Sequence, residues 1–277
     1  MASFKQWMVG CSVGCLGIAL LSIGGCVLFG YTVTQPFRNA VDTREQLVAE
    51  QGSQESYTPP PDGVVSDDRV QVFLRVRAAI QPTCAALKSF EDTIIAIEES
   101  GQAVEAGEES KSALFKDGLK VARSALGIAG NLGDFFYARN KALLENQMNL
   151  GEYTYIYLSA YNEVLRKHEA DHRVPFSQEP TLSRRVRQLL VEAFERQIDA
   201  AREAGGHEEV IALLGSEVSA LDLERGRIPF ADGLPPDLDA AFTPHRKALD
   251  ALYCSSTRGF ELRHSRTHAG GISIQIN

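Results

Sequence analysis

The chain has no charged residue between Gln6 and Phe37. Within this stretch, the 27 residues from Trp7 to Val33 are nearly all apolar or small, and about 20 such residues span a bilayer as a helix. A cleaved signal peptide has a shorter apolar region with small residues at its cleavage site, and no such site follows Val33. The sequence therefore predicts a retained transmembrane helix over residues 7–33.

A lipid anchor is the main alternative to this helix. The segment Ile23–Cys26 resembles a bacterial lipobox, and Lys5 supplies the positive charge that precedes a signal sequence. The residues Val27–Phe29 continue the apolar run, whereas a mature lipoprotein normally continues in a polar linker after the lipidated cysteine. We therefore prefer the transmembrane helix to a lipid on Cys26.

The rest of the chain lacks a basic excess. Lys5 is one of 28 Lys and Arg residues, so 27 basic residues face 36 Asp and Glu residues beyond the run, a net charge of −9. This balance argues against nucleic acid as a partner and against docking on anionic lipid. Large domains cross the membrane largely regardless of charge. We expect a single-pass signal-anchor protein of the cell (inner) membrane, with residues 1–6 in the cytoplasm and the domain on the extracytoplasmic side.

Cysteine is scarce outside the apolar run. Three of the five cysteines, Cys11, Cys15 and Cys26, lie within the run, where they behave as small apolar residues. The other two, Cys84 and Cys254, are expected to form a disulfide if the domain lies outside the cytoplasm. Two buried free thiols are the alternative for a cytoplasmic domain.

The domain shows no strand-like alternation and no internal repeat. Its apolar residues recur instead at intervals of three and four, the period of one helix face. The expected helices run from Ser66 or Asp67 to Gly101, and over residues 108–128, 132–168, 182–204, 208–224 and 237–253. Pro82 lies inside the first of them and should kink it. The sequence therefore predicts one all-α multi-helix bundle domain over residues 66–254.

Two segments flank this bundle. Residues 34–65 are expected to contain a short juxtamembrane helix and then a proline-rich linker, which we interpret as a semi-rigid spacer that lifts the domain off the membrane. Residues 255–277 are expected to form a basic, flexible tail. Its last residues, Ile272–Asn277, alternate apolar and polar side chains, so they either add a strand to a partner's sheet or remain disordered.

One motif has the spacing of a zinc site. His168 and His172 form an H-E-x-x-H motif with Glu169, which resembles the thermolysin-like zinc peptidases, and Glu192 matches the position of their third ligand. The resemblance implies zinc held by His168, His172 and Glu192, with Glu169 acting on the bound water. However, the motif is charged nearly throughout and Pro175 follows it closely. A solvated helix end, where His and Arg interact with the helix dipole, is the alternative.

A row of tyrosines is a second candidate site. Tyr153, Tyr157 and Tyr161 share one helix face, and Glu152 lies beside them. These residues line either a ligand cleft or the core, with hydroxyl groups that reach its rim.

The sequence contains no phosphate-binding loop, no glycine-rich dinucleotide turn and no G-x-S-x-G motif. We therefore expect a membrane-anchored binding or scaffold protein rather than an enzyme, without a cofactor. Its expected contacts are the lipid bilayer and a protein partner, and the small residues Gly10 and Gly14 offer one helix face for a homodimer. The alternative is a membrane-tethered, zinc-dependent hydrolase.

Overall fold

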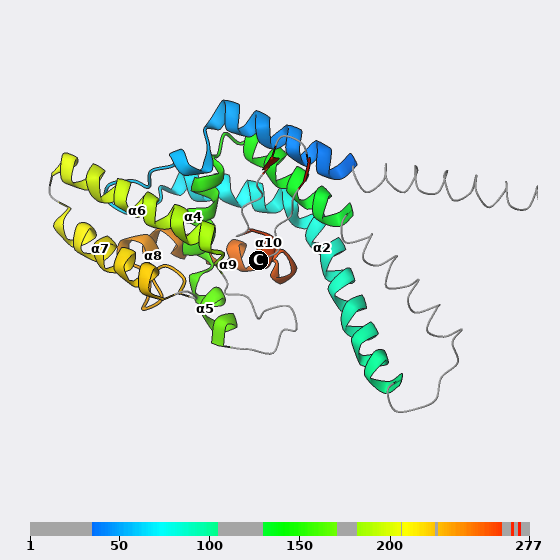
Figure 1. Cartoon of the computed structure of the whole chain (residues 1–277). Helices are drawn as coiled ribbons and strands as arrows, with labels where there is room; N and C mark the ends of the chain where they lie inside the picture. The colour runs from blue at the N-terminus through cyan, green and yellow to red at the C-terminus, as the bar shows by residue number, and fades with distance from the viewer. Residues whose placement is uncertain are drawn as a thin grey trace, which may run out of the picture.

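A computed structural model shows an all-helical, multi-helix bundle (Figure 1). The structure describes residues 35–104, 130–170, 182–205, 207–224, 227–261, 267–268 and 271–272. The predicted helix over 108–128 lies outside these residues, as do the predicted transmembrane run and the small residues Gly10 and Gly14 within it. Among the described helices, none combines the length and the apolar character that a membrane span requires.

Two of the described helices span residues 35–51 and 130–145 and are named here by these ranges. The other elements carry labels. The longer labelled helices are α2 (Asp67–Val104), α4 (Leu150–Ala160), α5 (Asn162–Ala170), α6 (Arg184–Ala204) and α7 (Glu208–Leu223). The shorter ones are η1 (Gln54–Ser56), α8 (Pro236–Phe242), η2 (Thr243–His245), α9 (Arg246–Leu252), η3 (Ser255–Thr257) and α10 (Arg258–Glu261). Two-residue strands, β1 (Thr267–His268) and β2 (Gly271–Ile272), pair in antiparallel fashion.

Helix α2 runs through Pro82 without ending there. Figure 1 shows its first part crossing the bundle and its second part turning away from it. Because proline has no N–H group, the carbonyl of Ala78 loses its partner in the helix. One turn later, the hydroxyl of Thr83 donates to the carbonyl of Ile80 at 2.7 Å. The bend expected from the sequence therefore has a local cause.

The predicted helix over 132–168 is three helices in the structure. The first break falls at Gln147, whose φ of 50° is left-handed, and Asn149 then caps α4 by accepting a hydrogen bond from the Gly151 N–H at 2.6 Å. The second break falls at Tyr161, between α4 and α5. Every residue from Tyr153 to Ala160 is buried, so α4 is the central helix of the core.

The proline-rich linker does not extend away from the domain. Its carbonyls are held by side chains of the bundle: Asn149 Nδ2 reaches those of Gln51, Gly52 and Ser53 at 2.8–3.1 Å. Arg196 and Gln197 on α6 donate to the carbonyls of Tyr57 and Pro60 at 2.9 and 2.7 Å. The interpretation of this segment as a spacer is therefore wrong, because hydrogen bonds to α4 and α6 fix it on the domain surface.

Asn149 is expected to be a stability determinant of this packing. Asn149→Ala removes a helix cap, worth about 0.5–2 kcal/mol, together with the donor to three linker carbonyls, and buried hydrogen bonds contribute about 0.5–1.5 kcal/mol each. We expect a loss of about 2–4 kcal/mol in the free energy of unfolding, measured by urea denaturation. Asn149→Asp keeps the cap acceptor but sets a carboxylate against the carbonyls. If the hydrogen bonds to the linker carbonyls stabilise the domain, Asn149→Asp should lower the free energy of unfolding as much as Asn149→Ala. Full stability of Asn149→Asp would contradict a stabilising role of these hydrogen bonds.

The start of the predicted tail also belongs to the bundle. Residues Ser255–Glu261 form η3 and α10, and Thr257 and Glu261 are buried. The packed domain therefore extends past the boundary expected at residue 254. The sequence signal was misleading because these two helices are too short to show a helical period.

Candidate functional site

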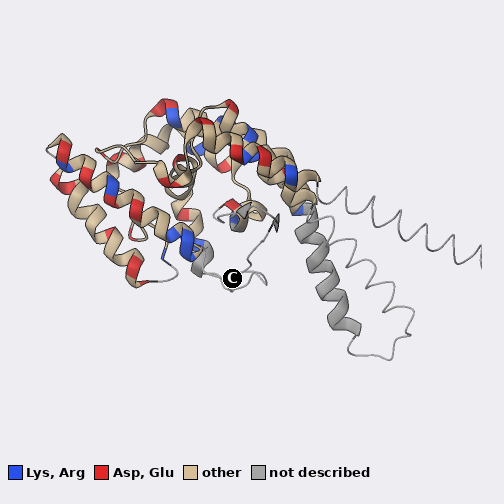
Figure 2. Ribbon diagram, turned by 45° about the horizontal axis from the view of Figure 1, so that its top comes forward, with Lys and Arg blue, Asp and Glu red and all other residues tan. Residues whose placement is uncertain are grey.

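Charged residues of both signs lie along the outer helices (Figure 2). Among the described residues, four charged side chains are exceptions and lie buried: Arg77, Arg139, Glu217 and Glu261. A buried charge is costly unless it is paired and hydrogen-bonded, so these side chains mark the places where the interior is organised by polar contacts. Glu217 accepts from the Phe230 N–H at 2.8 Å, which fixes the loop after α7.

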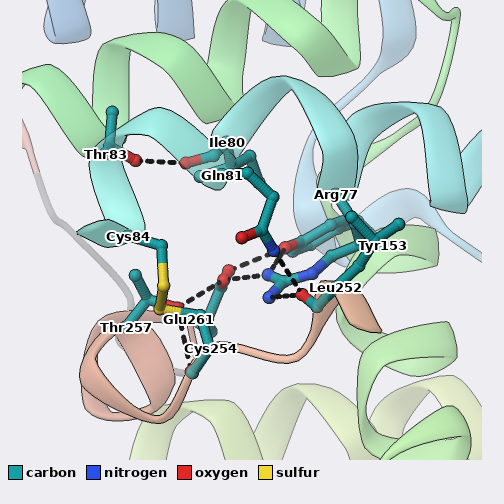
Figure 3. The surroundings of a disulfide bond; sticks show 10 residues. All are labelled: Arg77, Ile80, Gln81, Thr83, Cys84, Tyr153, Leu252, Cys254, Thr257 and Glu261. Atoms are coloured by element: carbon teal, nitrogen blue, oxygen red, sulfur yellow. Dashed lines mark hydrogen bonds and ion pairs between the residues drawn. A yellow bond between two sulfur atoms is a disulfide. The ribbon is translucent and has the colours of Figure 1, made fainter. Parts of the chain in front are cut away.

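The most extensive of these polar clusters lies beside a disulfide (Figure 3). Cys84, in α2, is bonded to Cys254, just before η3, with 6.1 Å between the two Cα atoms. The bond joins residues 170 positions apart, and they are the two cysteines that the even count singled out. It fastens the C-terminal end of the domain to its first long helix.

An ion pair beside this disulfide makes a second connection between α2 and the C-terminal end of the domain. The guanidinium of Arg77 on α2 bonds to the carboxylate of Glu261 on α10, and the two side chains are only 1 % and 0 % exposed. Tyr153 O–H donates to the other carboxylate oxygen of Glu261 at 2.8 Å, and the Thr257 hydroxyl donates to Glu261 at 3.1 Å. The carboxylate is therefore enclosed by donors from three elements.

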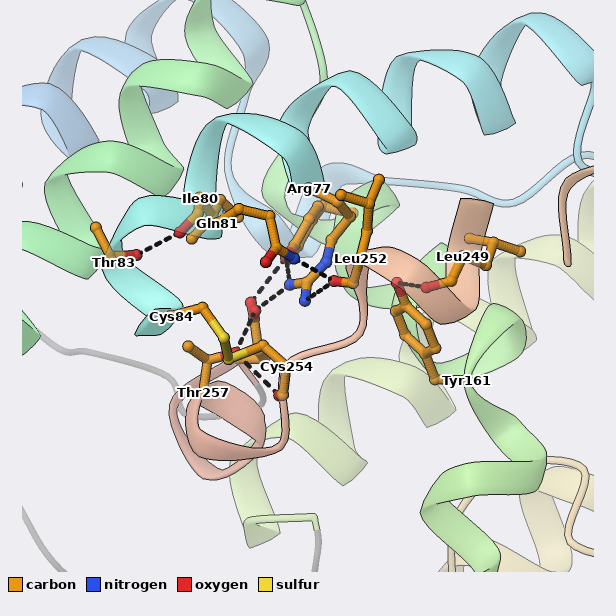
Figure 4. A network of polar contacts seen from close by, with 12 residues as sticks. Arg77, Ile80, Gln81, Thr83, Cys84, Tyr161, Leu249, Leu252, Cys254 and Thr257 are labelled. Atoms are coloured by element: carbon orange, nitrogen blue, oxygen red, sulfur yellow. Dashed lines mark hydrogen bonds and ion pairs between the residues drawn. A yellow bond between two sulfur atoms is a disulfide. The ribbon is translucent and has the colours of Figure 1, made fainter. Parts of the chain in front are cut away.

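Arg77 also holds the chain just before the disulfide. Its Nη2 and the Gln81 side-chain amide both donate to the carbonyl of Leu252, at 2.9 and 2.8 Å (Figure 4). Burial opposes the charge of Arg77, but the neighbouring Tyr153 and Glu261 more than offset burial, and the pKa of Arg77 lies well above its usual value. The guanidinium of Arg77 therefore stays charged in the folded domain.

The tyrosine row lies against this ion pair in the core. Tyr153 and Tyr157 are fully buried, and burial raises the pKa of both hydroxyls well above the usual value. Tyr161 donates to the carbonyl of Leu249 at 3.1 Å, and burial raises its pKa to about 12. Arg77 lies over the Tyr157 and Tyr161 rings, 5.4 and 5.6 Å from their centroids. The rings therefore pack around a cation rather than around an open cleft.

The fourth residue of the predicted cleft points elsewhere. Glu152 accepts two hydrogen bonds of 2.5 Å from Arg69 of α2, so the structure does not bring it to the tyrosine rings as a common lining. Because this pair is bidentate, it fixes the start of α4 against α2.

The predicted zinc ligands are only partly described. His168 and Glu169 lie in the last turn of α5, and Glu192 lies half-buried on α6. His172 falls outside the described residues. Within the part of the chain that the structure describes, no three His, Cys, Asp or Glu side chains are grouped so that they hold a metal ion. The zinc site stays an untested prediction.

The sequence did not predict the ion pair between Arg77 and Glu261, although one of the two residues, Arg77, carries a recognisable signal. Arg77 follows Phe73 by four residues and precedes Ile80 by three, so it is a charge on the apolar face of α2. Glu261 gave no comparable signal, since it lies beyond the last periodic segment.

A search for matches among known protein families, curated proteins and solved structures finds none for this chain.

Proposed function

We propose that the protein is a single-pass membrane protein whose helical domain faces the extracytoplasmic side and acts by binding a protein partner, as a scaffold or envelope-assembly component. The observation that carries this proposal is the Cys84–Cys254 disulfide. Disulfides persist in oxidising compartments and are rare in the cytoplasm. Together with the uncharged run before the domain, the bond supports export of the domain.

Two features support binding rather than catalysis. Arg77 and Tyr157, whose pKa values both lie well above the usual values, are buried in the core, whereas a catalytic acid or base must come within hydrogen-bond reach of a substrate. The disulfide and the Arg77–Glu261 pair also fasten both ends of the bundle together. A surface presented on such a rigid frame loses little conformational entropy on binding.

The proposed anchor would hold the domain close to the bilayer. Only one residue lies between the end of the predicted span at residue 33 and the start of the helix over 35–51. This helix packs on the helix over 130–145, where Asn140 Nδ2 donates to the carbonyl of Ala40 at 3.0 Å. At Gly133, an added Cβ would lie 2.7 Å from the side chain of Pro36, so only glycine allows these helices to approach. Little chain is left to act as a spacer.

The topology is testable with protease and intact spheroplasts. We expect added protease to remove the domain, while a cytoplasmic control protein in the same spheroplasts remains intact. Digestion only after lysis would reverse the proposed orientation. An acyl chain on Cys26, sought by mass spectrometry of the purified protein, would replace the transmembrane helix by a lipid anchor.

The binding role is tested by purifying the full chain from membranes and identifying the proteins that accompany it. We expect at least one stoichiometric protein partner that remains through two orthogonal purification steps. The same preparation should be analysed for metal, because stoichiometric zinc without a partner would favour the hydrolase.

A further inference from the structure

The outer face of α7 lacks the charges that a solvated helix face normally carries. Between Glu209 and Asp222, the exposed residues of α7 are apolar or carry a hydroxyl group: Ala212, Leu213, Ser216 and Ser219. The only charge in this interval, Glu217, is buried and accepts a hydrogen bond from the Phe230 N–H. A surface helix normally has charged or polar side chains opposite its buried face, and a helix that is apolar all round is normally covered. The composition of this face therefore indicates a covered surface.

Two leucines are exposed on this face. Leu213 and Leu223 are 37 % and 83 % exposed, and Val48 is the one other large apolar side chain that is exposed in the described part of the chain. At 100° per residue, the two leucines lie on the same outward half of α7. Single exposed apolar side chains are ordinary, but two on one uncharged helix face form a patch of the kind that marks interaction sites.

Gly215 is a further observation on the same helix. A glycine inside a helix costs stability relative to alanine. At Gly133 and Gly151 the fold explains the glycine, since an added Cβ would collide with Pro36 and with the carbonyl oxygen of Gln54. At Gly215 nothing lies within 4 Å of the position of an added Cβ. The described fold therefore gives no reason for this glycine, whereas the close approach of a partner would.

The charges that border this face are acidic. α7 has no Lys or Arg: Glu208 and Glu209 lie in its first turn, Asp222 lies in its last turn and Glu224 caps it. Figure 2 shows basic and acidic residues on α6 but only acidic ones on α7. Carboxylates are unfavourable at the C-terminal end of a helix, where the helix dipole is also negative. A cation from outside would therefore be stabilised there by the carboxylates and by the dipole together.

The arginines of this chain do not balance these carboxylates. The described arginines just before and after α7 have carboxylate partners at 2.7–3.7 Å: Arg202 with Asp199, and Arg227 with Glu217, Glu224 and Asp232. Arg225 lies outside the described residues. Even with its charge included, Asp and Glu outnumber Arg on and around α7, so the surroundings of the apolar face stay negative.

We propose that α7 is the docking surface for an amphipathic helix of the partner protein, whose apolar stripe is bordered by Lys or Arg. The stripe covers Leu213 and Leu223 and comes closest at Gly215, and the basic residues meet the acidic ends of α7. A second copy of this chain fits less well, because two α7 helices side by side bring carboxylates together whether they run parallel or antiparallel. This inference rests on the proposed binding role and adds the chemistry of the partner.

Site-specific photo-crosslinking in native membranes tests this surface. The full-length protein carries Leu213→benzoylphenylalanine or, as a second position, Leu223→benzoylphenylalanine, and mass spectrometry sequences the segment to which each is crosslinked. We expect one partner segment with apolar residues at intervals of three and four and with Lys or Arg on both sides of them. Val48→benzoylphenylalanine is the matched control and should not crosslink to that segment. The sequence of the segment decides the result, not the capture of a protein alone.

Two substitutions separate binding from stability. Gly215→Ala should raise the melting temperature by about 2–4 °C, and Asp222→Lys should raise it slightly, because lysine suits the C-terminal end of a helix. Both should nevertheless lower the crosslinking yield from position 213 at least about fivefold, Gly215→Ala by an added methyl group at the contact and Asp222→Lys by repulsion of the partner's cations. Glu45→Lys, at an exposed position of the helix over 35–51, should leave the yield unchanged.

Several results would overturn the proposal: crosslinks only to lipid or to a second copy of this chain, a segment without Lys and Arg, or unchanged yields in Gly215→Ala and Asp222→Lys. If a stoichiometric partner accompanies the purified protein but neither position on α7 crosslinks to it, this inference fails and the proposed function stands. If no protein partner accompanies the full chain, the proposed function itself fails.

Discussion

Removal of the disulfide is expected to lower the free energy of unfolding by about 5 kcal/mol. The Cys84→Ala, Cys254→Ala double variant frees a closed loop of 170 residues, and the entropy that a crosslink removes from the unfolded chain grows with loop length. Guanidinium denaturation monitored by circular dichroism measures the loss. Because a small domain has only about 5–15 kcal/mol in total, the variant should be marginally stable or unfolded at 37 °C.

Reduction supplies the matched control for this prediction. A phosphine reductant should shift the midpoint of the unaltered protein to that of the double variant, and it should leave the double variant unchanged. Peptide mapping without reductant should show the crosslinked pair. Recovery of two fully alkylated thiols from the native protein would contradict both the bond and the export of the domain that the bond supports.

The surface helices of the bundle could be predicted from the sequence. In α6, the residues Val186, Leu190 and Phe194 recur at intervals of four and all are buried. Ser183 caps the helix through the Val186 N–H, and Gly205 ends it with a positive φ of 72°. These signals are local, since a helix with one buried face carries its own period, cap and stop. For α6 and α7 the predicted and observed bounds accordingly differ by two residues at most, whereas the helix predicted over 237–253 is divided into α8, η2 and α9.

The central helix could not be delimited in the same way. α4 is buried on every side from Tyr153 to Ala160, so its sequence lacks the polar face that would mark where it starts and ends. The break before it depends on Asn149 and on the turn at Gln147, the break after it falls at Tyr161, and none of these residues interrupts the apolar pattern strongly. Long-range contacts decide such boundaries.

The candidate site was the least predictable part, because its pairing joins distant segments. Arg77 and Glu261 are 184 residues apart, and nothing in either segment identifies the other. The linker shows the same limit: a run of prolines predicts an extended backbone, and the structure agrees that the backbone is not helical at residues 57–60. Whether such a segment projects into solvent or lies on a helix is decided by side chains elsewhere, here Asn149 and Gln197.

Glu261→Gln is expected to destabilise the domain by about 3–5 kcal/mol, the cost of breaking a buried ion pair by removing one partner. The glutamine keeps the volume, but its single side-chain oxygen accepts from only one of Tyr153 and Thr257, which donate to different oxygens of Glu261. It leaves the buried guanidinium of Arg77 without its counter-charge, since Glu261 is one of the groups that raise the pKa of Arg77 against the effect of burial. Thermal and urea denaturation of the variant measure the loss, with the disulfide intact in both proteins.

A double variant separates the charge from the packing. Arg77→Met combined with Glu261→Leu removes both charges, and replacement of a buried pair by apolar side chains is often neutral or stabilising. We therefore expect the double variant to be more stable than Glu261→Gln alone, with a coupling energy above about 1 kcal/mol in the double-mutant cycle. If Glu261→Gln costs less than about 1 kcal/mol, α10 does not lie on α2 in solution. The disulfide would then be the sole tie between α2 and the chain beyond Leu252.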